Sequence, residues 1–94
     1  MRFVWDEGKS RRNLAKHKIS FETALLVFED PYAISSPDRI VDGEERWLTL
    51  GLASGIVVLV VAHTYGEKDG EEMIRLISAR RATPLDRRIY DENL

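Results

Sequence analysis

Cysteine is missing from this 94-residue chain, which excludes disulfide bonds and catalysis by a thiol. A chain without disulfides fits a reducing compartment, so the expected location is the cytoplasm. The first residues, Met1 to Asp6, lack the apolar segment of an export signal. The longest apolar run, Ile56 to Ala62, is much too short to span a membrane. We therefore expect no membrane partner.

Residues that bind metals are also scarce. The chain has two histidines, His17 and His63, and its acids lack the spacing of a zinc or calcium site. The sequence therefore predicts no metal and no other cofactor. An excess of positive charge is absent as well, because the net charge is −2 at pH 7, which argues against a strong non-specific nucleic-acid binder. The length leaves room for one domain over residues 1–94.

The charges that are present are segregated along the chain. Basic residues gather between Lys9 and Lys18 and again between Arg75 and Arg88, whereas acids gather at 42–45 and 67–72. The acidic segments contain glycine, which favours turns, so we interpret them as solvated hairpin loops. The two basic segments are the candidate surfaces for an anionic partner.

Capping residues and apolar spacing predict three helices. Asp6 is a favourable N-cap for a helix that ends near His17. Ser20 caps a second helix, which ends at the Asp-Pro pair 30–31. Thr83, followed by proline, begins a last helix. The residues that this helix is expected to bury are Leu85 and Ile89.

Between the helices the apolar period changes to two, which indicates strands. The pattern locates strands at 46–52, 56–62 and 73–79, and a short strand at 2–5. The run 56–62 is apolar on both faces, which marks a central strand covered on both sides. The predicted class is α+β, with a small antiparallel sheet, two N-terminal helices and one C-terminal helix in the order β-α-α-β-β-β-β-α.

Hairpin geometry predicts which strand residues meet. If the turn at 53–55 is tight, it fixes the pairing of the strands on either side. The next hairpin has a longer loop, which leaves its register open by a residue or two. The expected neighbours are Leu52 with Ile56, Arg46 with Ala62, Glu45 with His63, His63 with Arg75, and Val57 or Val58 with Arg80 and Arg81. Two separate arginine groups follow. One lies toward one end of the sheet and contains Arg46, His63, Tyr65 and Arg75. The other lies roughly 20 Å away, at about 3.3 Å per strand residue.

The second group is the pair Arg80 and Arg81, which follows the strand 74–79 directly and precedes the helix start at Thr83. Two adjacent arginines do not belong in a core, and helix N-termini attract anions, so this junction is a candidate anion site. On an extended strand the two side chains point to opposite faces. An ion pair with Asp86 is the alternative for Arg81.

The first helix contributes a third basic element. Lys9, Arg12 and Lys16 fall on one stripe at spacings of three and four residues. A solvated helix face explains such a stripe. The functional interpretation is a polynucleotide backbone that runs from the stripe to the arginine pair, which requires the two to be neighbours. The adjacent stripe, expected to face inward, contains Asn13, Leu14 and His17.

Residues over essentially the whole chain resemble the BrnT toxins of bacterial type II toxin-antitoxin pairs. The matching segments are Phe3-Val4-Trp5-Asp6, Lys9, Asn13-Leu14-Ala15-Lys16-His17, Ile19-Ser20-Phe21, Ala24, Val27-Phe28, Asp30-Pro31, Glu45-Arg46, Ile74 to Ala82, Arg87-Arg88 and Tyr90. The resemblance implies a fold similar to RelE and a ribonuclease activity that stops translation. It also implies a small ribbon-helix-helix antitoxin, forming a heterotetramer that represses its own operon, so that operator DNA is bound only through the antitoxin.

One residue departs from the family pattern. Where the family usually has a glycine after Lys16 and His17, this chain has Lys18. If the backbone there is left-handed, a lysine carries about 1 kcal/mol of strain.

RNA can be cut without a metal if a base takes the 2′-OH proton and cations stabilise the charge on the phosphorus. Arginine suits the second task because it is always charged and bidentate toward phosphate. We therefore assign it to Arg80 and Arg81, with Arg46 or Arg75 as the second cation.

Groups for proton transfer are fewer. His63 is the better candidate base, since it leaves the central strand beside Arg75, whereas His17 ends a helix, where a structural role is favoured. Tyr65 and Tyr90 suit base stacking or proton donation, or are ordinary surface aromatics.

A different class of function competes with the ribonuclease. A small domain with segregated charge and an arginine-bearing face also suits a non-catalytic module that binds an acidic or helical protein. In that case the chain is an inactive toxin homologue that acts only through its antitoxin or operator complex.

Overall fold

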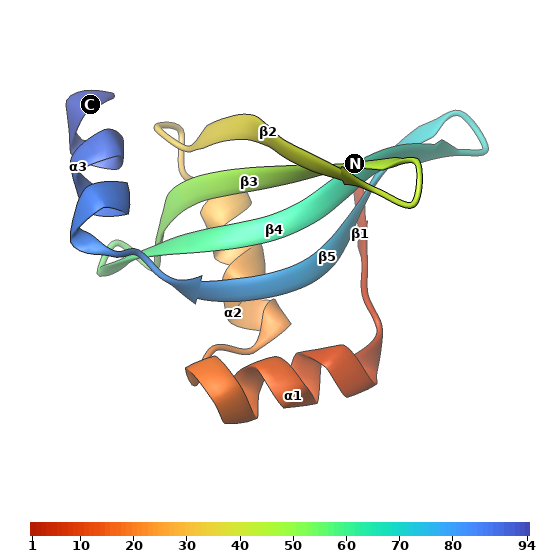
Figure 1. The fold of residues 1–94 in the computed structure, drawn as a ribbon, viewed down its shortest axis with the longest axis horizontal. Helices are drawn as coiled ribbons and strands as arrows, with labels where there is room; N and C mark the ends of the chain where they lie inside the picture. Colours follow the sequence, from red (N-terminus) through yellow and green to blue (C-terminus); the bar gives the residue numbers. More distant parts are fainter.

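The computed structural model describes residues 1–94 and contains a five-stranded sheet with helices on both sides (Figure 1). The strands are β1 (Arg2–Val4), β2 (Ile34–Val41), β3 (Glu44–Ala53), β4 (Val57–Lys68) and β5 (Glu71–Arg81). The helices are α1 (Glu7–His17), α2 (Phe21–Ala24), the short 3-10 helix η1 (Leu25–Glu29) and α3 (Pro84–Glu92). This order confirms the predicted α+β class and element sequence. No helix has the length and apolarity that a membrane crossing requires.

The strands lie in the order β1-β5-β4-β3-β2. The sheet is antiparallel except for β1, which pairs with β5 in parallel, so the prediction of a wholly antiparallel sheet was wrong at this edge. The chain crosses from β1 through the helices before it returns, and this permits the parallel pairing. Because β1 ends opposite Arg75, the rest of β5 forms the edge of the sheet, and α1 lies beside it.

The predicted caps are present. Asp6 accepts a hydrogen bond from the backbone N–H of Lys9 at 3.0 Å, and Ser20 caps α2 by accepting from Thr23. Lys18, at the C-terminal cap of α1, has φ 63° and ψ 26°, so its backbone is left-handed and the condition for strain at this lysine is met.

Replacing Lys18 by glycine is expected to raise the free energy of unfolding by about 0.5–1 kcal/mol, because glycine adopts this conformation without strain. Urea denaturation measures the change. Lys16→Gly is the matched control, since it puts glycine inside the same helix and should lower stability by about 1 kcal/mol. Equal destabilisation by both substitutions would contradict the strain at Lys18.

One face of the sheet, which we call the helix face, is covered by α1, α2 and η1. The buried residues of its core are Ile19, Phe21, Ala24, Val27, Ala53, Leu59, Val61, Ile74, Leu76 and Ala79. Gly51 of β3 allows η1 to approach closely, because a Cβ there would lie 2.6 Å from Cγ1 of Val27 and 2.9 Å from its carbonyl oxygen. The close approach fixes η1 directly on the sheet.

The opposite face is covered by a helix at one end only. Tyr90 of α3 is 3% exposed and packs with Leu50, Val58 and Val60. The prediction that α3 buries its two large aliphatic residues was wrong, because the side of the helix that bears Tyr90 faces the sheet. Leu85 and Ile89 are 63% and 45% exposed. Figure 1 shows α3 at the end of the sheet away from the β2–β3 and β4–β5 hairpins. The uncovered part toward these hairpins is called the open face below.

The predicted register was wrong by two residues. The loop between β3 and β4 is Ser54 to Ile56, one residue later than expected, because Ser54 and Gly55 both adopt positive φ and Ile56 is 81% exposed. A shift of two leaves each side chain on its predicted face. Between β4 and β5 the register differs from the expected pairs by one residue toward the hairpin, which turns Arg75 to the face opposite His63, and by two residues beyond the bulge between Ala62 and His63. The observed pairs are Leu52–Val58, Leu48–Ala62, Trp47–His63, His63–Leu76, Thr64–Arg75, Val60–Arg80 and Leu59–Arg81.

Candidate functional site

A row of long basic side chains crosses the open face. Arg39 of β2 pairs with Arg46 of β3, and Thr64 of β4 pairs with Arg75 of β5. Extending the register of β3 and β4 by one residue places Arg46 across from Thr64. Since cross-strand partners share a face of the sheet, the three arginines lie on one side. The predicted grouping of Arg46 with Arg75 is therefore confirmed.

Arg46 and Arg75 converge on a single carboxylate. The Oε1 atom of Glu44 accepts a hydrogen bond from Arg75 Nη2 and lies 3.9 Å from Arg46 Nε. Arg46 Nε is buried and has no hydrogen-bond partner. Two guanidinium groups that meet at one anionic oxygen form a site that can hold a phosphate oxygen.

Arg80 lies on the same open face, at the end near α3. Its cross-strand partner is Val60, four residues along β4 from the partner of Arg75, which separates the two arginines by about 13 Å. Ser78, which is exposed, and Ala62, half-buried, pair with each other between them. The two arginine groups are therefore distinct, as expected, but they border one continuous surface.

Arg80 is the arginine that pairs with Asp86, at 2.7 Å, and not Arg81 as the alternative proposed. The physical reason is the alternation of the strand, which turns Arg80 toward α3 and Arg81 toward the helix face. Thr83 and Asp86 form a reciprocal capping box. Burial alone would raise the pKa of Asp86, but hydrogen bonds from Arg80 and Thr83 hold it below the ordinary value of 3.8. Arg81 is exposed and borders a shallow pocket with Thr83 and Arg87.

The basic stripe of α1 faces a groove of about 410 Å³ between α1 and β5. Its lining residues are Lys9, Arg12, Asn13, Lys16, His17, Ile77 and Ser78, and no acid is among them. None of the three stripe cations forms an ion pair of 4.0 Å or less; the six ion pairs of the chain all lie elsewhere. We call the part of the open face that bears Arg39, Arg46, Arg75 and Arg80 the arginine surface. Ser78 belongs to both the groove and the open face, so the basic stripe of α1 and the arginine surface are neighbours.

Asn13 fixes α1 against the free edge of β5. It is 7% exposed, and its amide nitrogen donates to the carbonyl oxygens of Ile19 and Ala79, at 2.8 and 2.9 Å. Its amide oxygen accepts from the N–H of Ala79 at 3.1 Å. Asn13 thus satisfies both backbone groups that a neighbouring strand would bind. Its neighbour Leu14, also predicted to face inward, is 49% exposed, because Asn13 occupies the side of α1 that faces β5.

His63 lies on the helix face and not beside Arg75, because the register set by the β4–β5 turn pairs His63 with Leu76 and Thr64 with Arg75. It is 0% exposed. Its Nε2 lies 2.7 Å from Thr49 Oγ1, which in turn lies 2.7 Å from Ser35 Oγ. Its Nδ1 is buried without a partner. In this geometry His63 cannot touch a ligand on the open face.

Burial lowers the pKa of His63 below its ordinary value of 6.5, although the nearby backbone of Thr64 opposes the shift. The folded state therefore favours the neutral ring, whereas the unfolded chain takes up a proton near pH 6.5. The contribution of His63 to the free energy of unfolding is therefore fully present above pH 6.5. It should fall below pH 6.5 by up to about 1.4 kcal/mol per pH unit. Urea midpoints between pH 7.5 and 5 test this, since His63→Gln should abolish the decline and His17→Ala should keep it. A decline that persists in His63→Gln would contradict the assignment.

The two candidate tyrosines are not part of the arginine surface. Tyr65 is 41% exposed and packs edge-on against Trp47 and His63, which places it on the helix face. The hydroxyl of Tyr90 donates to Asp30 at 2.5 Å. Burial and this carboxylate raise the pKa of Tyr90 to about 12, so its proton is held in the core.

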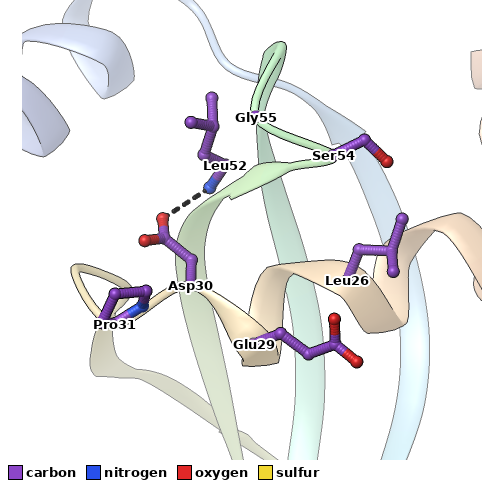
Figure 2. A pocket seen from close by; sticks show the side chains of 7 residues that line it. All are labelled: Leu26, Glu29, Asp30, Pro31, Leu52, Ser54 and Gly55. Atoms are coloured by element: carbon purple, nitrogen blue, oxygen red, sulfur yellow. Dashed lines mark hydrogen bonds between the residues drawn. The ribbon is translucent and has the colours of Figure 1, made fainter.

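A shallow pocket of about 310 Å³ lies near α3, and Figure 2 shows the seven residues that line it. Its acids are Glu29 and Asp30, and Asp30 Oδ2 accepts from the backbone N–H of Leu52 at 2.8 Å. Two carboxylates disfavour a phosphate, so this pocket does not suit an anionic ligand. The chain contains no cluster of three or more His, Asp or Glu residues that could hold a metal ion.

Comparison with known proteins identifies the family. Residues 5–86 match the family model described as the ribonuclease toxin BrnT of a type II toxin-antitoxin system. The chain belongs to the BrnT family. A crystal structure of the Brucella abortus ribonuclease toxin BrnT is similar, with 31% sequence identity and a TM-score of 0.68 over 88% of this chain and 97% of that one. No curated protein matches the chain.

Membership of the BrnT family confirms the resemblance found in the sequence. It makes the chain a member of a family of ribonuclease toxins, and a type II system implies RNA as the substrate class and a protein antitoxin as a partner. Two residues of the arginine surface were missed from the sequence, Glu44 and Arg39. The signal for Glu44 was present, because it stands two residues before Arg46 and so shares its face.

Proposed function

We propose that this chain cleaves RNA on its open face without a metal ion, and that cleavage of messenger RNA in the cytoplasm stops translation. The observation that supports this most strongly is the convergence of Arg46 and Arg75 on one anionic oxygen. A phosphate group placed beside this carboxylate would meet the same two guanidinium groups, and their charge would stabilise the phosphorane-like transition state. In-line attack by the 2′-OH needs no cofactor if the phosphate is held in this way.

Arg80 is assigned to a neighbouring phosphate of the same RNA strand. It lies on the same face, about 13 Å from Arg75 along the strands, and its partner Asp86 is also held by the capping box. Arg81 and His63 face the other way, so the proposal gives them no contact with the reacting phosphate. His63 instead supports the sheet through its contact with Thr49.

The groove beside α1 is proposed to hold the RNA backbone outside the cleavage site. Lys9, Arg12 and Lys16 line it without an acid, and Ser78 joins it to the open face. Such contacts position the strand and make affinity depend on salt. Tyr65 lies on the helix face, so it would stack with a base only on the side of the sheet opposite Arg46 and Arg75.

The antitoxin is proposed to be a small ribbon-helix-helix protein that forms a heterotetramer with the toxin and binds the operator. An acidic segment of such a partner would suit the same groove and arginines as RNA does. The competing function, a non-catalytic binding module, is favoured by one observation: Arg75 and Arg80 already pair with Glu44 and Asp86.

Incubation of the purified chain with a defined messenger RNA, with and without EDTA, distinguishes these functions. We expect cleavage that EDTA does not change. Arg80→Ala should lower the cleavage rate by about tenfold or more. Arg81→Ala, which replaces the adjacent arginine on the other face, should leave the cleavage rate close to that of the unsubstituted chain. Intact RNA together with tight binding of the protein encoded by the neighbouring gene would support the binding module instead.

A further inference from the structure

Glu44 is held in a defined position at the start of β3. The preceding turn consists of Asp42 and Gly43, both with positive φ, at 51° and 79°. Val41 pairs with Glu44 directly across this two-residue turn. Turns of this kind match the twist of the strands and fix their register. The carboxylate therefore stands on an ordered hairpin and not on a long loop.

Only one of the two carboxylate oxygens of Glu44 forms a hydrogen bond or an ion pair with other residues. Oε1 meets both Arg75 and Arg46, while Oε2 has no hydrogen bond within the chain. The side chain is 44% exposed. The charged groups that face it are Arg46 on its own strand, Arg75 on β5 and, beyond Arg46 on β2, Arg39. An ionised oxygen is thus open to solvent beside the two cations assigned to the phosphate.

We propose that Glu44 is the general base of the cleavage reaction, an inference that rests on the proposed function. The 2′-oxygen attacks the phosphorus while its proton passes to Oε2 of Glu44, and the bond from phosphorus to the 5′-oxygen breaks. The leaving 5′-oxygen takes a proton from water, and Glu44 later returns its proton to solvent. The products are a 2′,3′-cyclic phosphate and a free 5′-hydroxyl. This reaction requires no oxidant, reductant or metal.

The other acid-base groups of the chain are less suitable. His63 is 0% exposed and faces the helices. Asp86 Oδ2 already accepts from Arg80, from the N–H of Thr83 and from its hydroxyl. Glu45 is adjacent to Glu44, but strand alternation turns it to the opposite face, where it forms no ion pair of 4.0 Å or less. A base must lie within hydrogen-bond reach of the 2′-OH, and Glu44 alone combines access with the two arginines.

Glu44→Gln tests this role, with Glu45→Gln as a control that makes the same change of charge in the same hairpin. We expect kcat for a defined RNA to fall about a hundredfold in Glu44→Gln with little change in KM, and to stay within about twofold in Glu45→Gln. The fall in rate toward acid pH should disappear with the carboxylate, and Glu44→Asp should retain part of the activity. Mass spectrometry should find 2′,3′-cyclic phosphate ends.

Binding of a 2′-deoxy oligonucleotide, which lacks the attacking group, separates loss of chemistry from loss of structure. Both glutamine variants should bind it at least as tightly as the unsubstituted chain. Faster cleavage by Glu44→Gln would show that Glu44 competes with the phosphate for Arg46 and Arg75, and would overturn the inference. An unchanged cleavage rate with an unchanged pH profile would also overturn it. If the unsubstituted chain leaves RNA intact, the proposed function fails and this inference fails with it.

Discussion

Replacing Arg46 and Arg75 together by alanine is expected to lower kcat/KM for RNA cleavage by about a thousandfold or more. The two guanidinium groups meet at one anionic oxygen, so the double variant removes both cations from the place assigned to the phosphate. Removing a single well-placed donor to a developing charge typically costs about a hundredfold to a thousandfold. Because the two groups act on the same phosphate, the double variant should lose less than the product of the single losses.

Arg39→Ala provides the matched control. Arg39 stands in the same row, next to Arg46, but its side chain is 74% exposed and pairs with its neighbour Asp38 at 3.6 Å. We expect its loss to reduce cleavage by less than about tenfold and to weaken the salt dependence slightly. Equal effects of Arg39→Ala and of the double variant would indicate a general charge requirement and would contradict a specific phosphate site.

Replacing Asn13 by alanine is expected to lower the free energy of unfolding by about 3 kcal/mol or more. The substitution removes three buried hydrogen bonds and leaves the N–H and C=O of Ala79 without partners between α1 and β5. Each buried polar group left unsatisfied costs about 1–3 kcal/mol. The destabilisation also loosens α1, which carries the basic stripe, so salt-dependent RNA binding should weaken with it.

Urea denaturation measures this effect, and Leu14→Ala is the control from the same turn of α1. Leu14 is 49% exposed, so its truncation should change stability by only about 0.5 kcal/mol. If the two substitutions were equally mild, the hydrogen bonds of Asn13 would not hold the helix to the sheet edge as described.

The local elements of this fold follow closely from the sequence. Asp6, Ser20 and Thr83 cap helices where they were expected to, because side-chain oxygens that accept from nearby backbone N–H groups act over three residues. The change from helical to alternating apolar spacing likewise located the main strands. For Lys18 the sequence indicated a left-handed backbone only as the condition for strain, and the structure meets that condition.

The tertiary details could not be predicted in the same way. The loop after β3 was misplaced by one residue because both Ser54 and Gly55 accept positive φ, and the sequence does not say which residue closes the strand. The turn at 69–70 sets a register in which His63 pairs with Leu76 and Thr64 pairs with Arg75, one residue from the expected pairing of His63 with Arg75. A histidine after a central strand looks the same in sequence whether it faces the core or a ligand.

The candidate site was predicted in part. Arg46 and Arg75 were grouped correctly at one end of the sheet, but the expected pairing of Arg75 with His63 would have turned the two arginines to opposite faces. The observed pairing of Arg75 with Thr64 turns them to the same face. Their meeting point at Glu44 depends on the reach of long side chains across three strands, which neither periodicity nor spacing reports. The exposure of Leu85 and Ile89 was also unpredictable, since the choice of Tyr90 as the buried residue of α3 depends on Asp30, sixty residues earlier.

The central claim is that RNA binds and reacts on the open face, between Arg46, Arg75 and Arg80. Titration of ¹⁵N-labelled protein with a 2′-deoxy oligonucleotide tests it directly, because the arginine side-chain and backbone N–H signals report which face the strand touches. We expect the largest changes at the Nε–H signals of these arginines and at the amides of Thr64 and Ser78. Changes confined to Arg81 and the start of α3, with the open face unmoved, would contradict it.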